Sequence, residues 1–456
     1  MRDTSLTIDG NDTVTITQDG TVSTTADRAY GVESIGGDNT ITNFGMILTL
    51  GEDAHGIRNT GTTTTINNGG FIRAFGGGSH GIDNTGNSAT LTNSGTIASD
   101  GVGIRNSGND ARITNTGVIN ASAHGIRNSG NRATITNLGV IRATGVDRDG
   151  MHFTSASRNS TFTNSGIIIS EQRRAIRASG SVNNLTVNLN APGFLGGGIL
   201  FNNSTTLNIT TGASHSVLWQ LPDTSVLSGD APNVSGPVPW FYDAATGQFA
   251  TFDPTGLTAS FNQLADTSNT LARVGRYGLG RARAGDGAGA GAIGTSDTPL
   301  AYGDGGKAAQ SFDILLATNS GPYATYGPAS GRFWITGFGG YANHDGDDAT
   351  LDQRIDQIGA AIGYAWQQSP ETRFSVMAGY MNGTITAESP WADAQDIDSN
   401  GVFAGLYGDR RFGPVTVGLG VAGGWQTNDS TRFVNDNLAT SGGLYTGEST
   451  ATSTYD

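Results

Sequence analysis

One glycine–aliphatic motif recurs between Tyr30 and Ala178, in the copies Tyr30-Gly31-Val32, His55-Gly56-Ile57, His80-Gly81-Ile82, Val102-Gly103-Ile104, His124-Gly125-Ile126 and Asp149-Gly150-Met151. Its glycines are separated by 25, 25, 22, 22 and 25 residues. A second motif, asparagine-x-glycine, runs in step with the first from Asn43-Phe44-Gly45 to Asn164-Ser165-Gly166. Repeats of this length are typical of solenoids, in which each coil buries its apolar side only against its neighbours.

Each repeat contains three short β-like pieces separated by Asn, Gly, Ser and Asp, the residues that favour turns. In one repeat they are Gly125–Asn128, Thr134–Asn137 and Gly139–Ile141. The pattern predicts an all-β chain whose residues 1–252 form a parallel β-helix with three strands per coil. We expect irregular last coils and a cap at about 180–252. The cap would be made by aromatic residues, namely Trp219, Trp240, Phe241, Tyr242, Phe249 and Phe252.

The spacing predicts three inward columns of aliphatic side chains. The first is Val32, Ile57, Ile82, Ile104, Ile126, Met151 and Ile176. The second is Ile16, Ile41, Ile66, Leu91, Ile113, Ile135 and Phe162. The third is Val22, Ile47, Ile72, Ile97, Ile119, Ile141 and Ile168. The asparagines of the second motif predict an amide ladder, in which each side chain bonds the next coil about 4.8 Å away.

An outward column is charged, and it reads Glu33, Arg58, Asp83, Arg105, Arg127, His152 and Arg177. Its first four members alternate in sign, so we expect ion pairs between their coils. Arg105 over Arg127 is a like-charge contact that the pattern does not explain.

Length differences between repeats fall mainly at one corner: nine steps separate Ile72 from Gly81, but only six separate Ile97 from Gly103. Insertions in a solenoid map to loops, so this corner is the predicted contact surface.

Composition narrows the function classes. The 456 residues carry a net charge of -14, which argues against nucleic acid as a partner. There is no cysteine, and hence neither a disulfide framework nor a thiolate metal site. No stretch of 18 apolar residues predicts a transmembrane helix. The N-terminus lacks the features of a signal peptide, so an exported protein would have lost its start.

Residues 253–275 change to a helical period. Asp253-Pro254 suits a helix start, and Leu257, Phe261, Leu264, Leu271 and Val274 follow at helical spacing. This helix either packs on the solenoid end or threads a pore. Residues 276–330 are rich in Gly, Ala, Ser and Thr and are predicted to be a linker. They contain Gly289-Ala290-Gly291-Ala292-Ile293-Gly294, but no strand precedes it, so we expect no dinucleotide site.

Residues 331–456 alternate apolar with small or polar side chains over long strands, as in Ile358–Trp366 and Val415–Trp425. Short connections, Gln368–Thr372 and Arg410–Pro414, separate long acidic ones, Asn343–Gln353, Glu388–Ser399 and Thr427 to about Ser449. This pattern indicates an outer-membrane barrel with the long loops outside. The alternative is a water-soluble barrel, which would turn its apolar side inward.

These strands resemble the opening strands of the autotransporter β-domain of type V secretion. The resemblance rests on Trp334–Tyr341, Ile362-Gly363-Tyr364, Met377-Ala378-Gly379-Tyr380 and Gly405-Leu406-Tyr407-Gly408. It implies a β-helical passenger upstream, a helix threading the barrel, and display on the surface of a Gram-negative cell. It also implies outer-membrane lipid and the barrel-assembly machinery as partners. The family's barrel has more strands than the five found here and a sixth expected near Ser453, so we expect the chain to be a fragment.

Three clusters are candidate sites. His55, His80 and His124 share a column that could hold zinc or copper, but Val102 interrupts it. Asp147 and Asp149, on either side of Arg148, could do acid–base chemistry on a sugar. Asp345-Gly346-Asp347-Asp348 resembles the start of a calcium loop but lacks its later ligands. In each case an ordinary turn or exposed loop is the default explanation of the residues, so we predict no catalytic, cofactor-binding or metal residues.

The sequence therefore favours a surface-displayed autotransporter whose passenger is adhesive or structural and is not an enzyme, with a host or cell-surface ligand as its partner. Two alternatives remain open at this point. The passenger could act on polysaccharide, as some β-helical lyases and hydrolases do, or it could be an architectural spacer without a ligand.

Overall fold

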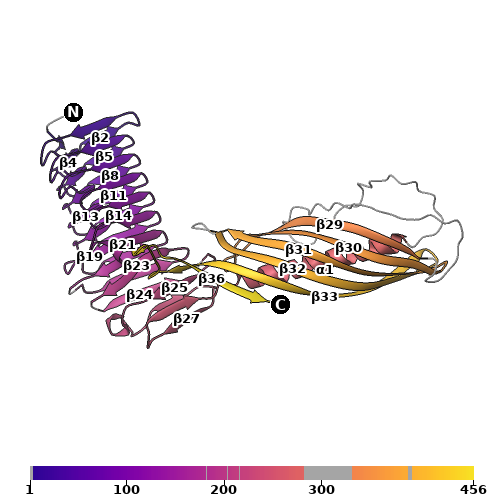
Figure 1. The fold of residues 1–456 in the computed structure, drawn as a ribbon. Coiled ribbons are helices and arrows are strands. Elements are labelled where there is room, and N and C mark those ends of the chain that lie inside the picture. Colours follow the sequence, from indigo (N-terminus) through magenta and orange to yellow (C-terminus); the bar gives the residue numbers. More distant parts are fainter. Residues whose placement is uncertain (1–3, 181, 203, 215, 282–330, 389–392) are drawn as a thin grey trace. The chain divides into compact units, whose positions relative to one another are not determined.

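The computed structural model describes residues 4–180, 182–202, 204–214, 216–281, 331–388 and 393–456. The chain divides into two compact units (Figure 1). The first comprises Met1–Asp253 and Val434–Ser449, and the second comprises Pro254–Phe433 and Thr450–Asp456. The parallel β-helix that the repeats predict is present in the first unit.

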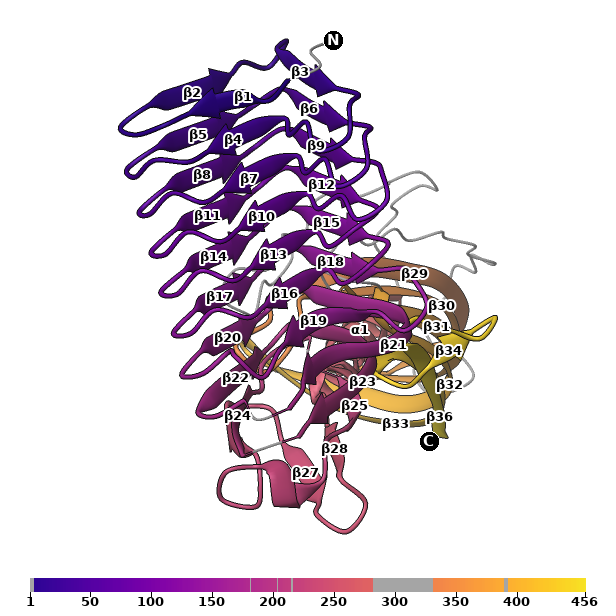
Figure 2. The ribbon, with the colours of Figure 1, turned by 90° about the vertical axis from the view of Figure 1, so that its left-hand side faces the viewer.

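Each coil contributes one strand to each of three stacked columns (Figure 2). The first column is β1 (Leu6–Ile8), β4 (Val32–Ser34), β7 (Ile57–Asn59), β10 (Ile82–Asn84), β13 (Ile104–Asn106), β16 (Ile126–Asn128) and β19 (Asp149–Phe153). The second is β2 (Thr13–Ile16), β5 (Thr40–Asn43), β8 (Thr65–Asn68), β11 (Thr90–Asn93), β14 (Arg112–Asn115), β17 (Thr134–Asn137), β20 (Thr161–Asn164), β22 (Leu185–Asn190), β24 (Thr205–Thr210) and β26 (Asn233–Ser235). The third is β3 (Thr21–Thr24), β6 (Met46–Thr49), β9 (Phe71–Ala74), β12 (Thr96–Ser99), β15 (Val118–Ala121) and β18 (Val140–Ala143).

The long strand β21 (Ile167–Ala178) joins the first and third columns into one sheet, because it pairs with both β18 and β19. It continues as one strand through the corner at which earlier coils place a loop of variable length, with register irregularities against β23 between Ile169 and Ile176. β23 (Phe194–Phe201) then pairs with β21 and continues the stack.

The strand register confirms the first and third aliphatic columns over their whole predicted length. The second column is confirmed from Ile41 onward, but its predicted first member is wrong. Val14, and not Ile16, pairs with Ile41, whereas Ile16 pairs with Asn43. The first coil has two extra residues in its turn at Thr17–Gly20, so counting back by the usual 25 residues selects the wrong side chain.

The predicted amide ladder is present and fully buried. Asn43 Nδ2 donates to Asn68 Oδ1 at 2.7 Å, and the same bond repeats through every coil as far as Asn164. A second ladder, which the sequence analysis missed, runs from Asn59 to Asn128. Each asparagine between the ends of a ladder accepts from one coil and donates to the next, so these buried amides are satisfied, whereas Oδ1 of Asn43, at the start of the first ladder, makes no hydrogen bond.

The glycine of the repeated motif is required by close packing between coils. A Cβ atom at Gly81 would lie 2.6 Å from the carbonyl oxygen of Gly103 and would collide with the side chain of Ile97. The equivalent glycines in neighbouring coils meet the same neighbours. In these coils the first and third strands can therefore approach closely because this position lacks a side chain.

The last coils end in an antiparallel group of short elements: β25 (Val217–Gln220), the 3₁₀ turn η1 (Thr224–Val226), β27 (Trp240–Asp243) and β28 (Gln248–Thr251). The predicted aromatic cover is only partly correct. Trp219 and Phe249 are buried, but Trp240, Phe241 and Phe252 are exposed. The rest of this end is built by residues 434–449, which carry β34 (Thr440–Ser441) and β35 (Leu444–Tyr445).

The second unit is an antiparallel sheet of long strands around one helix. Its strands are β29 (Arg332–His344), β30 (Gln353–Ser369), β31 (Thr372–Glu388), β32 (Asp393–Phe412), β33 (Val415–Asp436) and β36 (Glu448–Tyr455). They are longer than predicted, because backbone pairing continues past the apolar stretch into polar residues that we assigned to loops, as between Gln395 and Arg432. The sixth strand starts at Glu448, before the predicted Ser453.

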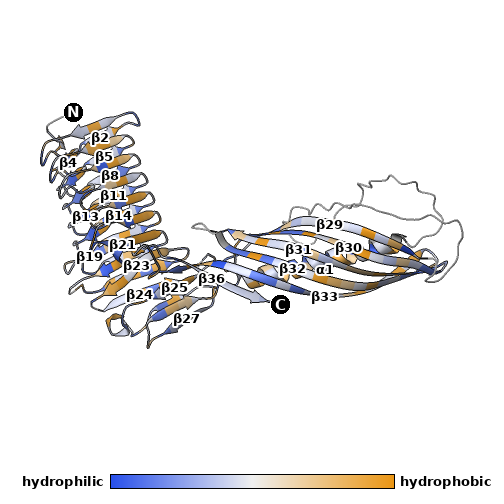
Figure 3. Ribbon diagram, viewed as in Figure 1, coloured by the Kyte–Doolittle hydropathy of each residue, from blue (hydrophilic) through white to orange (hydrophobic). Residues whose placement is uncertain are grey.

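The two faces of this sheet differ as the alternation predicts, and apolar and polar residues are interspersed along its strands (Figure 3). Apolar side chains such as Phe333, Ile362 and Leu419 are exposed on one face. The other face carries aromatic side chains that lie over glycines directly opposite them: Trp334 over Gly363, Phe338 over Gly359, and Tyr407 over Gly420. The small residues of the inner face therefore leave room for flat rings on the neighbouring strand. An outward apolar face is the opposite of what a water-soluble barrel requires.

Helix α1 (Thr255–Arg281) packs against the inner face and runs six residues past the predicted end at Gly275. Leu271 and Val274 are buried there as expected. Three other residues predicted on the same stripe, Leu257, Phe261 and Leu264, are exposed. Among the described residues, no helix is both long and apolar enough to cross a membrane.

The first half of α1 uses polar contacts in place of that stripe. The buried residue Gln263 accepts hydrogen bonds through Oε1 from Ser399 Oγ at 2.9 Å and from Gln426 Nε2 at 2.8 Å. In the second half of the helix, Tyr407 donates to the carbonyl oxygen of Leu271 at 3.1 Å. The helix turns its polar side inward because the facing strands are polar at that level.

Candidate functional site

The histidine column proposed for a metal has a structural role in the β-helix. Nδ1 of His55 accepts a hydrogen bond from the backbone N–H of His80 at 3.1 Å, and Nδ1 of His80 accepts one from Val102 at 3.0 Å. The rings of His55 and His80 stack with their centroids 4.7 Å apart. A ring nitrogen that accepts cannot carry a proton, so both rings are neutral with the proton on Nε2. Burial lowers the pKa of His80 to about 3, in keeping with this state.

The third histidine belongs to a different cluster. The potential ligand atoms of His124, Asp149 and His152 all lie within 4.8 Å of one another, and all three residues are buried. His152 stands in the outward column, and its meeting with His124 was not predicted. The repeat could have predicted this meeting, because His152 stands one coil after Arg127, and Arg127 is three residues from His124.

One chain of hydrogen bonds satisfies both rings in this cluster. The backbone N–H of Asp149 donates to Nδ1 of His124 at 2.9 Å, so the proton of His124 is on Nε2. That nitrogen lies 3.3 Å from Nδ1 of His152, and Nε2 of His152 lies 2.9 Å from Ser179 Oγ. Burial lowers the pKa of His124 to about 4 and that of His152 to about 3. The ring nitrogens are thus already committed, and the arginines nearby disfavour a bound cation.

The carboxylate of Asp149 is completely buried and makes no hydrogen bond through its side chain. Its neighbours are arginines, with Nη1 of Arg177 at 3.6 Å and Nε of Arg173 at 3.8 Å. Burial raises the pKa of Asp149, and the positive charges of Arg173, Arg177 and Arg174 oppose that rise. Asp149 therefore serves as an internal counter-ion for a group of arginines.

The predicted acid–base pair on a sugar is not assembled as two reachable carboxylates. Asp147 Oδ1 lies 3.7 Å from Arg173 Nε and its side chain is 79% exposed, whereas the side chain of Asp149 is 0% exposed. A general acid or base must reach the proton that it transfers. Asp149 is sealed beneath the guanidinium groups and cannot meet a substrate without their displacement.

Five arginines surround this cluster, and we call them the arginine corner: Arg127, Arg148, Arg173, Arg174 and Arg177. They lie on β16, on β21 and in the turn between β18 and β19, at the corner whose length varies between coils (Figure 2). Elsewhere in the outward column the predicted ion pairs are present. Arg58 lies 2.7 Å from Glu33, and Arg105 lies 3.1 Å from Asp83.

The aspartates predicted to resemble a calcium loop form a turn between β29 and β30. Asp347 Oδ1 accepts hydrogen bonds from the backbone N–H groups of Ala349 at 2.8 Å and Thr350 at 2.9 Å. These bonds lower the pKa of Asp347. Asp352 Oδ1 accepts from the N–H of Gly346 at 2.8 Å. The glycine motif at 289–294 and most of the predicted linker lie outside the described residues.

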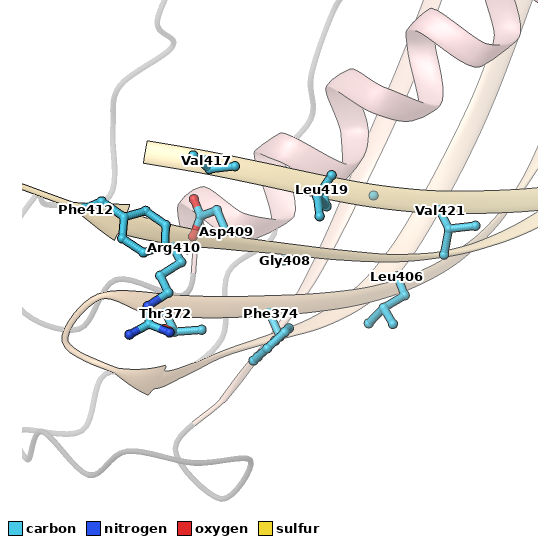
Figure 4. Close-up of a pocket in the computed structure, with 11 residues that line it drawn as sticks. Thr372, Phe374, Leu406, Gly408, Asp409, Arg410, Phe412, Val417, Leu419 and Val421 are labelled. Atoms are coloured by element: carbon cyan, nitrogen blue, oxygen red, sulfur yellow. The ribbon is translucent and has the colours of Figure 1, made fainter. Parts of the chain in front are cut away.

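The outward face of the sheet in the second unit carries a hollow on β31, β32 and β33 (Figure 4). Phe374, Leu406, Val417, Leu419 and Val421 supply most of its lining, and Arg410 and Asp409 lie toward the end where the turns are short. Because the lining is mainly apolar, the hollow suits a hydrocarbon group better than a polar substrate.

Residues 333–455 match the family model of the autotransporter β-domain. The match covers β29 to β36 and leaves the β-helix and α1 outside it. No curated protein and no solved structure matches the chain.

Proposed function

This chain is an autotransporter, with an outer-membrane β-barrel domain that carries a surface passenger, and we propose that the passenger is an adhesive β-helix on a Gram-negative cell. The observation that carries the proposal is the stack of coils itself. Its interior is filled by aliphatic columns and two asparagine ladders, so its outward side chains are free to make contacts. A rigid rod with a periodic surface suits repeated weak contacts better than catalysis.

The second unit supports the anchoring half of this proposal. Exposed apolar side chains such as Leu419, Val421 and Ile362 would contact outer-membrane lipid, and the hollow beside Leu406 would take an acyl chain. The barrel-assembly machinery would insert such a sheet. α1 packs on the inner face, where its hydrogen bonds with Ser399, Gln426 and Tyr407 would hold the passenger's connection inside the barrel.

We propose that the passenger is not an enzyme. The two acidic residues that could act on a sugar are an exposed Asp147 and a sealed Asp149, and the histidines beside them are neutral acceptors in the coil packing. The polysaccharide-acting alternative therefore has no accessible pair of carboxylates at the predicted place.

Display and adhesion can be tested together on cells that carry the full chain. An epitope inserted at Gly77, an exposed turn with open space around it, would report display by antibody binding to intact cells. Deleting residues 82–125 joins Gly81 to Ile126, removes two coils and keeps the register of the stack. We expect the shortened passenger to be displayed at the same level but to bind fewer host cells or glycan-coated surfaces.

Three results would contradict the proposal. Unchanged adhesion after the deletion would favour a spacer. Release of oligosaccharides from a glycan, lost in Asp147→Asn or Asp149→Asn, would favour an enzyme. Epitope that is detected only after the cells are broken would rule out surface display.

A further inference from the structure

We propose that the arginine corner binds the acidic groups of a carboxylated or sulfated carbohydrate, an inference that rests on the proposed adhesive function and names its ligand class. The first observation is a break in charge compensation along the outward column. Glu33 and Asp83 neutralise the arginines of the next coils, but no carboxylate lies in the column after Arg105. The column continues through Arg127, His152 and Arg177, and the histidine is neutral.

The second observation is that the carboxylates beside the column are too few. Asp147 and Asp149 are the acidic residues that face the five arginines, and the ion pairs that they make go to Arg173 and Arg177. Five positive and two negative charges leave three charges uncompensated. Arg127, Arg148 and Arg174 have no ion pair within the described part of the chain. A neighbouring arginine, Arg142, does have its own partner in Glu171 at 2.5 Å.

The third observation concerns nitrogen atoms of these arginines that have no hydrogen-bond partner. Nη1 of Arg174 and Nε of Arg177 are buried and make no hydrogen bond. Buried N–H donors are nearly always paired in folded proteins, and an exception often marks the place of a ligand or ion. Burial also lowers the pKa of Arg174 and Arg127, with the nearby charges of Arg173 and Arg105 adding to the effect. An anion placed here would relieve both the unpaired donors and the repulsion.

The chemistry favours a short acidic carbohydrate over a nucleic acid. Guanidinium groups bind carboxylates and sulfates through two parallel hydrogen bonds, so a set of arginines recognises spaced, planar or tetrahedral anions. Coils repeat about every 4.8 Å, which presents cations at intervals along one line. The whole chain has a net charge of -14, so a long polyanion such as genomic DNA would be repelled on either side of the corner, whereas a short acidic oligosaccharide would contact the corner alone.

The test uses the purified full chain in detergent and measures binding of four probes: a heparin oligosaccharide, an oligogalacturonate, a neutral dextran oligosaccharide and a single-stranded DNA. The variant Arg127→Gln/Arg148→Gln removes two guanidinium groups that have no ion pair, so the fold should survive. Arg73→Gln/Arg112→Gln makes the same change in net charge at exposed positions on other strands. Arg127→Lys/Arg148→Lys keeps both positive charges but removes the paired N–H donors of the guanidinium groups.

We expect one or both acidic carbohydrates to bind, with affinity that falls as salt rises, and dextran not to bind. The glutamine variant should raise the dissociation constant about tenfold for each arginine removed. The lysine variant should recover only part of the lost affinity. The Arg73→Gln/Arg112→Gln control should bind as tightly as the wild type. Comparing the affinities for heparin and oligogalacturonate shows whether the arginine corner prefers a sulfated or a carboxylated carbohydrate.

Equal binding of dextran, equal loss in the control variant, or tighter binding of DNA would overturn the proposal. Cell adhesion separates it from the proposed function. Adhesion that persists without any binding of acidic carbohydrate would leave the adhesive passenger standing and would end this inference, whereas joint loss of adhesion and of acidic-carbohydrate binding in Arg127→Gln/Arg148→Gln, with display unchanged, would support both.

Discussion

Oδ1 of Asn435 accepts a hydrogen bond from Nε1 of Trp219 at 2.7 Å, which ties two residues 216 positions apart into the same end of the β-helix. The same oxygen accepts from the N–H of Leu195 at 3.0 Å, and Nδ2 donates to the carbonyl oxygens of Leu195 and Gly447 at 2.8 Å. A single buried amide therefore satisfies four backbone or side-chain groups. The terminal coils depend on a segment that follows them by more than 200 residues in the chain.

Replacing Asn435 with Ala should lower the free energy of unfolding of the β-helix end by about 2–5 kcal/mol, because two buried donors lose their acceptor. Urea unfolding followed by circular dichroism, with protease cleavage near Leu195, would measure it. Thr440→Ala, at an exposed position in the same segment, is the matched control. Equal midpoints for the two variants would show that the hydrogen bonds of Asn435 contribute little.

The asparagine ladders make a second prediction. Asn106→Leu should cost about 1–3 kcal/mol, because it leaves the Nδ2 of Asn84 and the Oδ1 of Asn128 without their partners. Asn106→Asp should cost more, since it buries a negative charge that faces the acceptor oxygen of Asn128. Asn120→Leu, at an exposed position on β15, controls for the change in hydrophobicity. The measurement is the urea midpoint, and a loss in the control as large as that in Asn106→Leu would contradict the ladder's contribution.

Stability of the β-helix should fall as the pH falls below the ordinary histidine pKa. His80 is neutral when folded and burial lowers its pKa to about 3, against 6.5 for an ordinary histidine. The unfolded chain therefore binds a proton from about pH 6.5 downward that the folded chain does not bind, and the stability present above pH 6.5 is lost progressively toward pH 3.

His80→Asn tests this pH dependence, because an amide oxygen can still accept from the N–H of Val102 but does not titrate. We expect the variant to lose stability less steeply between pH 6.5 and pH 4, with the slope reduced by up to one proton. Denaturant midpoints across that range would measure it. An identical slope in wild type and variant would show that His80 does not control the acid sensitivity.

The contact between α1 and the inner face of the sheet makes a fourth prediction. A side chain at Gly275 would collide with the ring of Tyr407, and one at Gly278 would lie 2.6 Å from both the ring of Trp334 and the hydroxyl of Ser375. Gly275→Val should therefore displace the helix, at a cost of about 1–3 kcal/mol. Ala265→Val, at an exposed position on the same helix, adds comparable volume without a clash.

The chain has no cysteine, so a single Thr267→Cys substitution provides a buried reporter of that displacement. We expect a thiol reagent to label it faster in the Gly275→Val background by about tenfold, and no faster in the Ala265→Val background. Labelling that is equally slow in both backgrounds would mean that the helix keeps its place despite the collision.

The repeats were predictable because the same step between coils places the same residue type at the same level. The aliphatic columns, the first asparagine ladder and the Glu33–Arg58 and Asp83–Arg105 pairs all follow from that step. Ile16 was assigned to the wrong position because the first coil is two residues longer in one turn. The buried face of α1 was predicted only in part, because a helical period identifies an apolar face without showing which part of it contacts a partner.

Local periodicity thus determined the parallel β-helix, the alternating strands and the autotransporter resemblance, since burial in stacked coils and in lipid imposes regular spacing on the chain. Tertiary structure alone decided the contacts that periodicity does not encode. The meeting of His124 with His152, the sealing of Asp149 under arginines, and the reach of Asn435 to Trp219 depend on which surfaces lie together after folding. Hydrogen bonds and ion pairs act over a few ångströms, so such sites appear only when distant segments have been brought within that range.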